Sequence, residues 1–247
     1  MRVAVAAAAV MLVAGGSALA LTHDNRNHRG SSRPTPIGAW FGIARPCTPP
    51  PPEVGGIPLG EDGQPIQDFL PDPSICALAC DGGTCAPNAF PLLQVTMIPT
   101  LLADGTVLAD DFAELLDHHT TAQGKWEYVG KVRLDGTWVD KYQATFVWFT
   151  GQTDATGATK FVGSVRPRFV TFFDWRHPDQ MRGYIQPYLY PYTEDDGTIG
   201  RVVLKPDAPF PDPNPADPLP DTCDPGTPSL PQCLGTLHFN IQRIPAH

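Results

Sequence analysis

Hydrophobic and polar positions alternate along much of the chain, in runs rich in Val, Ile, Thr, Phe, Tyr and Trp. Residues of these types suit a pleated, half-buried surface, so each run predicts a β-strand. Asp-Gly and Thr-Gly pairs between the runs indicate tight turns. The predicted strands are Ile37 to Arg45, Phe90 to Thr100, Thr106 to Leu108, Lys125 to Val129, Lys141 to Thr150, Phe161 to Phe173, Arg182 to Tyr192, Arg201 to Leu204 and Leu234 to Ile244.

Only one segment, Asp110 to His119, predicts a helix, because its first residues can cap and its apolar residues share one face. About eight or nine strands with meander-type turns and almost no helix are typical of a barrel or a sandwich. A barrel leaves no long apolar strand at an exposed edge. We therefore expect an all-β, antiparallel, closed barrel of about eight or nine strands, decorated with long Pro-rich, disulfide-stapled loops.

The N-terminus has the features of a secretory signal peptide. Arg2 precedes an apolar stretch, Val3 to Ala14, and small residues end at Ala20, where we expect cleavage. A membrane anchor is the alternative, but the stretch is too short for a stable span. The predicted organisation is a signal peptide at 1–20, a flexible segment at 21–36 and a single barrel domain at 37–247. Export to the extracellular space or the periplasm follows.

Proline marks two long connections, which we place as loop insertions at 46–89 and 205–233. The chain has 29 prolines, and proline cannot donate to a sheet ladder or sit inside a helix. The second insertion also holds several aspartates. They lack the spacing of a calcium loop, so a stiff, solvated acidic loop is the favoured interpretation.

Charge excludes some partners. Seventeen basic against 26 acidic residues give a net charge of −9, which argues against nucleic acid as a partner. No long apolar run follows the first twenty residues, so no transmembrane segment is expected.

The six cysteines predict disulfides, because an exported chain meets an oxidising compartment. A zinc site is the alternative for the three closely spaced cysteines, but they lack paired C-x2-C knuckles. Cys223 with Cys233 is the most natural local pair, and the other pairings stay open. No metal and no cofactor are expected. The cysteines are Cys47, Cys76, Cys80, Cys85, Cys223 and Cys233.

A tyrosine stripe is the strongest local feature. Even spacing puts the side chains from Tyr184 to Tyr192 at every second position on one face of a strand, with Ile185, Pro187 and Leu189 on the other. An inward stripe lines a cavity for a flat ligand, an outward one binds a partner or a carbohydrate, and simple cross-strand packing is the third possibility. The stripe comprises Tyr184, Gln186, Tyr188, Tyr190 and Tyr192, with His238 on a polar face of the last strand as a second wall.

Candidate catalytic residues are Arg166, Arg168, Asp174 and His177. Two guanidiniums on one strand face can clamp a carboxylate or a phosphate, or else pair with surface acids. Asp174 and His177 can form an acid–base cluster at a barrel mouth, or simply cap a turn that Pro178 fixes. The chain contains no nucleophile-elbow, zinc-protease, P-loop or dinucleotide fingerprint.

The first predicted strand contains Gly38-Ala39-Trp40, and the last ends with Arg243. This resembles the lipocalin-like, or calycin, pattern, in which a late Arg stacks across the Trp of a G-x-W motif. The resemblance implies that Trp40 and Arg243 close one barrel end, and Trp126 lies in a second G-x-W. The stretch Thr120 to Trp126 and the strands after it look like secreted bacterial calycin-like barrels, which supports a fold but implies no activity.

Three functions are compatible with these patterns. The first is a secreted calycin-like barrel that binds a small hydrophobic or aromatic ligand. The second is a cyclase or isomerase on the same barrel, in which Tyr or His moves a proton and an Arg steadies an anionic intermediate. The third is a structural or interaction module of the cell envelope that makes contact through its Pro-rich loops.

Overall fold

The structure is a computed structural model that describes residues 33–50, 57–67, 70–88, 95–112, 120–153, 159–191, 219, 221–225 and 231–245. The predicted signal peptide, the strand at 201–204 and most of the acidic insertion lie outside the described residues. The elements, in chain order, are β1 (Gly38–Pro46), α1 (Pro73–Ala79), β2 (Val95–Leu101), β3 (Thr106–Phe112), β4 (Ala122–Leu134), β5 (Thr137–Thr153), β6 (Thr159–Phe173), β7 (Gln180–Pro191), β8 (Gln232–Cys233) and β9 (Leu237–Arg243).

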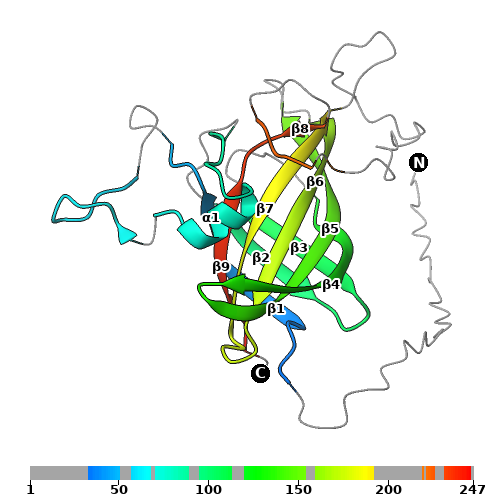
Figure 1. Cartoon of the computed structure of the whole chain (residues 1–247). Coiled ribbons are helices and arrows are strands. Elements are labelled where there is room, and N and C mark those ends of the chain that lie inside the picture. Colours follow the sequence, from blue (N-terminus) through cyan, green and yellow to red (C-terminus); the bar gives the residue numbers. More distant parts are fainter. Residues whose placement is uncertain are drawn as a thin grey trace, which may run out of the picture. The chain divides into compact units, whose positions relative to one another are not determined.

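The strands form a closed antiparallel barrel, which confirms the predicted fold class (Figure 1). Strands β1 to β7 pair in sequence order, β9 lies between β7 and β1, and the β6–β7 pairing closes the cylinder. Eight strands therefore make the barrel. The two-residue β8 is an extra strand that pairs with β7 beyond the end of β9.

The predicted helix at Asp110 to His119 is wrong where the structure describes it. Residues 110–112 extend β3 and pair with Thr96 to Ile98 of β2, and residues 113–119 lie outside the described residues. Ladder pairing with β2 outweighs local helix propensity, which is a weak determinant on its own.

The described helix, α1, instead lies in the first Pro-rich insertion, where the sequence predicted only loop. The carboxylate of Asp72 caps it by accepting hydrogen bonds from the amides of Ser74 and Ile75, at 3.1 and 3.2 Å. Pro73 occupies its first turn, where a missing N–H costs nothing. The Asp-Pro-Ser sequence is thus a helix start, which was not predicted because the surrounding segment is rich in proline.

The barrel interior is a packed core. Trp40, Phe169, Phe173, Phe239 and Ile241 all point inward, and each is at most 1% exposed. The rings of Phe169 and Phe239 stack with centroids 4.9 Å apart. Side chains this enclosed leave no room beside them for a water molecule, so this part of the interior is closely packed.

Glycines make the space for these large inward rings. A Cβ on Gly183 of β7 would lie 2.5 Å from Cζ of Phe239, and one on Gly42 of β1 would lie 2.6 Å from Cγ2 of Ile241. No real Cβ tolerates such contacts, so each glycine makes space for the large side chain paired with it on the neighbouring strand.

One barrel end carries the Trp–Arg pair that the calycin resemblance implied. The Arg243 guanidinium carbon lies 4.3 Å from the centre of the Trp40 ring, which is a favourable cation–π distance. Arg243 also donates to the carbonyls of Pro178, Ile37 and Thr35. These bonds fix the guanidinium across the end of the cylinder.

A cap covers part of the outside of the barrel. We use "cap" for residues 70–88, which contain α1, and Figure 1 shows α1 lying against β7 and β9. Ile75 of α1 is fully buried, in a second core on the outer surface of the barrel with Val139, Val170 and Phe172. The outer surface of β6 and β7 is therefore also buried where α1 packs against it.

The cysteines form three disulfides, as predicted: Cys47–Cys76, Cys80–Cys85 and Cys223–Cys233. The first attaches the cap to the end of β1, and the second closes a tight loop after α1. Two cysteines lie within short elements, Cys76 in α1 and Cys233 in β8, whereas the sequence placed all six in connections.

Candidate functional site

The polar and aromatic residues singled out in the sequence gather on the outer face of β6, β7 and β9. Alternation sends Ile185 into the barrel core and leaves its neighbours Tyr184 and Gln186 outside. The tyrosine stripe therefore lies outside the lumen, beneath the cap and the loops, and Tyr192 lies outside the described residues. We call the following residues the outer-face site: Ser164, Arg166, Arg168, Gln186, Tyr188 and Tyr190.

Strand register assembles this site. Antiparallel pairing sets Ser164 opposite Tyr190, Arg166 opposite Tyr188 and Arg168 opposite Gln186. Each arginine leans across to a tyrosine one row away. The Arg168 guanidinium carbon lies 5.8 Å from the Tyr188 ring centre, and that of Arg166 lies 5.2 Å from Tyr190. Cation–π contacts of this kind hold a guanidinium flat against a ring.

Arg168 is half-buried and oriented by two acceptors. Its Nη1 donates to Oε1 of Gln186 at 3.1 Å and to the backbone carbonyl of Asp221 at 2.8 Å. Both of these acceptors are neutral, and they fix the direction of the guanidinium. A guanidinium has five N–H donors in a planar fork, which suits a carboxylate or phosphate.

Gln186 connects the site to the cap. Its amide nitrogen donates to the Ala79 carbonyl at 3.1 Å and to the Thr236 hydroxyl at 3.2 Å. Burial raises the pKa of Tyr188, and Arg168 opposes that shift. The phenol of Tyr188 therefore stays protonated at neutral pH.

Ser164 marks the upper end of the outer-face site. Its side chain is 1% exposed, and its hydroxyl finds no hydrogen-bond partner in the structure. A buried hydroxyl without a partner costs free energy.

His238 lies on the same outer face, one row beyond Gln186, opposite Tyr184 of β7 and Arg45 of β1. It is 7% exposed, and its Nε2 atom also finds no partner in the structure. Burial, aided by the nearby Arg45 and Arg182 guanidiniums, lowers the pKa of His238 from 6.5 to about 4, against the opposing charge of Asp72. The imidazole is therefore neutral at physiological pH.

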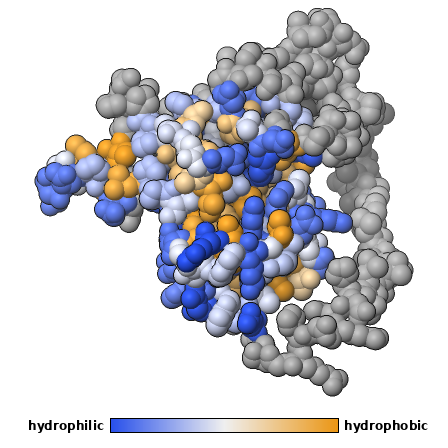
Figure 2. Space-filling model, in the orientation of Figure 1, coloured by the Kyte–Doolittle hydropathy of each residue, from blue (hydrophilic) through white to orange (hydrophobic). Residues whose placement is uncertain are grey.

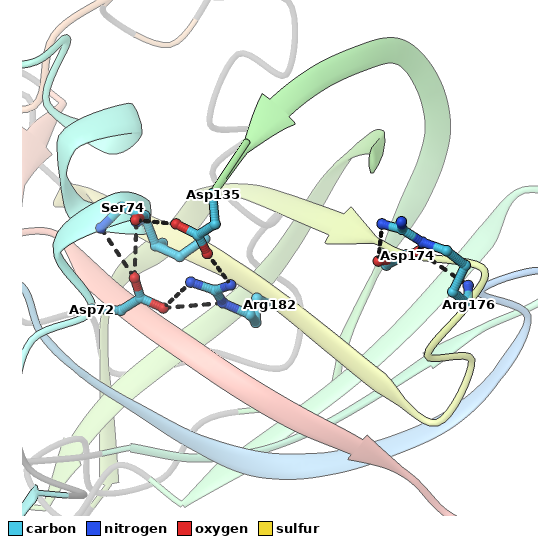
Figure 3. A network of polar contacts seen from close by, with 7 residues as sticks. Asp72, Ser74, Asp135, Asp174, Arg176 and Arg182 are labelled. Carbon is cyan, nitrogen blue, oxygen red and sulfur yellow. Dashed lines mark hydrogen bonds and ion pairs between the residues drawn. The ribbon is translucent and has the colours of Figure 1, made fainter. Parts of the chain in front are cut away.

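No pattern in the sequence indicated the ionic network that fastens the cap (Figure 3). Arg182 of β7 binds Asp72 at 2.6 Å and Asp135 of the β4–β5 turn at 2.7 Å. The Ser74 hydroxyl donates to Asp135 as well, and these bonds lower the pKa of that carboxyl. One guanidinium thus joins three segments that are far apart in the sequence.

Asp174 and His177 do not join the outer-face site. They lie in the β6–β7 turn, where Asp174 accepts from the Arg176 amide and forms a two-point ion pair with its guanidinium (Figure 3). Asp174 is six residues along β6 from Arg168, about 20 Å in an extended strand. The turn interpretation of these residues therefore fits the structure better than an acid–base cluster.

The outer-face site suits binding of an anionic group next to an aromatic or apolar body.

The described residues contain no group of three or more His, Cys, Asp or Glu side chains placed to hold a metal ion. Among the described helices, none is long and apolar enough to cross a membrane.

The chain is defined by its fold as an antiparallel eight-stranded β-barrel with an extra strand and a disulfide-stapled cap. Comparisons with protein-family models, with curated proteins and with solved structures find no match.

Proposed function

We propose that this chain is an exported, calycin-like β-barrel that binds a small ligand on its outer-face site. The ligand has a flat aromatic or apolar body and an anionic group. The observation that carries the proposal is the arrangement of Arg166 and Arg168, each next to a tyrosine ring on the same face of the barrel. An anionic group meets the partly exposed Arg168 guanidinium, and the body of the ligand stacks on the partly exposed ring of Tyr190. The buried Tyr188 and Arg166 support these two side chains from beneath.

The packed interior favours this face over the lumen as the binding region. A cavity ligand needs apolar walls with free volume between them, whereas the inward rings of Phe169, Phe173 and Phe239 are almost completely enclosed.

A binding function is favoured over the cyclase or isomerase alternative. Catalysis of that kind needs an acid or base within hydrogen-bond reach of the bound substrate. Asp174 is engaged by Arg176 in a remote turn. Burial keeps the Tyr188 phenol protonated and lowers the pKa of His238 to about 4. None of the three is therefore an effective base at neutral pH for a substrate held by Arg168.

Fluorescence titration with the anionic aromatic dye 1-anilinonaphthalene-8-sulfonate tests the proposal on the folded, oxidised chain. We expect saturable binding that 2-naphthoate displaces and neutral naphthalene methanol does not. Arg168→Gln should weaken dye binding about tenfold, as expected for loss of one charge-assisted contact. Arg176→Gln, which removes an exposed guanidinium in the β6–β7 turn, is the matched control and should leave the affinity unchanged.

Equal loss in both variants, or equal displacement by the neutral compound, contradicts the proposal. Arg168→Lys separates charge from geometry, because lysine keeps the charge but lacks the planar fork. Native mass spectrometry of the chain purified from its own host then identifies any ligand that stays bound.

A further inference from the structure

A second candidate surface lies on the long β4–β5 ribbon, away from the outer-face site. Strand register at the Tyr128–Gly130 bulge lets the ribbon leave the barrel wall, and Figure 1 shows it curving across the lower part of the barrel. Beyond the bulge, Val132, Leu134 and Val139 face the cap and are packed with Ile75. The opposite side of the ribbon is open.

We define the ribbon face as the residues on that open side, in four cross-strand rows. Pairing places Trp126 opposite Ala144, Tyr128 opposite Tyr142, Lys131 opposite Asp140, and Arg133 opposite Trp138. Within the barrel this same side of β5 points into the core, so the ribbon face continues the inner wall out into solvent. Its members are Trp126, Tyr128, Lys131, Arg133, Trp138, Asp140 and Tyr142.

Aromatic rings dominate this face and remain accessible. Trp138 is 64% exposed and Tyr128 is 53% exposed. Tyr142 supports the ring of Tyr128 in an edge contact, with centroids 5.5 Å apart, and that of Trp126 at 5.4 Å. The Trp126 indole nitrogen donates to the Leu102 carbonyl at 2.9 Å. The aromatic group is therefore held in place before any partner binds.

The polar residues between the rings carry both signs of charge. Lys131 and Asp140 face each other at 3.8 Å, which leaves lysine donors and carboxylate acceptors available side by side. Arg133 adds a second cation to the face, and its guanidinium donates to the Gly136 carbonyl. A hydroxyl-rich neutral ligand can bond to both members of the Lys131–Asp140 pair, whereas a charged ligand has to break that pair. Charge therefore favours a neutral, hydroxylated partner.

The size of the face favours a single extended chain. Two strands are about 10 Å wide, and the seven residues from Trp138 to Ala144 span about 20 Å. The resulting area of about 200 Å² is far below the roughly 800 Å² per partner of a stable protein interface. We propose that the ribbon face binds a linear neutral polysaccharide, with sugar rings stacked on Tyr128 and Trp138 and hydroxyls bonded to the Lys131–Asp140 pair.

Several observations make this face ready to bind. The ribbon is fastened at its tip by the Asp135–Arg182 ion pair and along its covered side by the apolar contact with α1. Burial, followed by the charge of Asp140 and by Tyr128, raises the pKa of Tyr142 to about 12. Its hydroxyl thus remains a neutral donor and acceptor at any physiological pH.

Native affinity electrophoresis of the folded chain tests the inference. Gels contain hydroxyethyl cellulose, galactomannan or dextran as neutral polymers, and polygalacturonate as the anionic one. We expect retardation by at least one neutral polymer. Tyr128→Ala and Trp138→Ala should each raise the dissociation constant about five- to tenfold, the loss expected for one stacked ring.

Trp138→Phe keeps a ring and should retain most of the binding, provided that circular dichroism shows every variant folded. Phe41→Ala removes a comparably exposed ring, 49% exposed on β1, and should change nothing. The inference is overturned if no neutral polymer retards the chain, if only polygalacturonate does, or if Phe41→Ala weakens retardation as much as Trp138→Ala. None of these outcomes bears on dye binding at Arg168.

Discussion

His238 shows how the tertiary environment changes one residue. The sequence placed it on a polar face of the last strand, and the structure buries His238 beneath the cap, between Arg45 and Tyr184. Two guanidiniums and little water surround an imidazole that already lacks a partner for Nε2. The folded state therefore resists protonation of this residue.

We expect the free energy of unfolding to fall as the pH drops from about 6.5 to about 4. In that window His238 takes up a proton in the unfolded chain, with its ordinary pKa of 6.5, but not in the folded chain, with a pKa of about 4. The contribution of His238 is at most about 3 kcal/mol. Urea unfolding of the native chain and of His238→Asn measures it, since the variant lacks this titration.

As the pH falls, the free energy of unfolding of the native chain should therefore decrease relative to that of His238→Asn. His177→Asn, at an exposed position in the β6–β7 turn, is the matched control and should follow the native pH profile. A native profile identical to that of His238→Asn between pH 7 and pH 4 contradicts the prediction.

At the scale of elements, the cap depends on links between distant segments rather than on its own helix. A seven-residue helix is too short to be stable alone. Arg182, Ile75 and the Cys47–Cys76 disulfide bind it to the barrel, and the cap in turn shields His238 and Gln186. Cap and outer-face site are therefore expected to lose order together.

The two cap disulfides should contribute unequally to stability. Cys47–Cys76 closes a separation of 29 residues and Cys80–Cys85 one of 5. Loop-closure entropy then predicts losses of about 3.5 and about 2 kcal/mol when each pair is replaced by alanines. Urea unfolding of the two double variants checks this order, and a larger loss for the short loop contradicts it.

At the scale of the whole molecule, the barrel is a solid scaffold whose outer surface carries its distinctive chemistry. Figure 2 shows hydrophobic residues interspersed with hydrophilic ones over the visible described surface. The large inward rings, matched by glycines such as Gly183, make the cylinder rigid. Side chains displayed on its outside then keep fixed relative positions.

Removing one ring from the core should create a cavity that the native chain lacks. Phe169→Ala is expected to lower the free energy of unfolding by about 3–5 kcal/mol, and benzene should raise the melting temperature of the variant. Native protein should show no such rise, and Phe41→Ala, at an exposed ring, should change stability by less than about 0.5 kcal/mol. Equal stabilisation of native protein by benzene would show that the lumen is not filled.

The sequence by itself determined the strands, the antiparallel barrel and the presence of disulfides, because alternation, turn residues and cysteine count are local or compositional properties. It also separated Tyr184 and Gln186 from Ile185 correctly. The sequence did not predict α1, because the only signal for the start of this helix is one Asp-Pro-Ser sequence within a proline-rich loop. It predicted a helix from Asp110, where residues 110–112 instead pair with β2.

Only the tertiary structure decided which strand face is interior. Period-two alternation divides a strand into two faces but does not say which one turns inward when both are rich in large side chains. Here the cap buries the outer face as well, so Tyr188 outside and Phe169 inside are equally enclosed. Strand register and chain closure, which act between residues far apart in the sequence, also decided which side chains meet. They bring Arg166 to Tyr190, Arg168 to Tyr188 and Asp72 to Arg182.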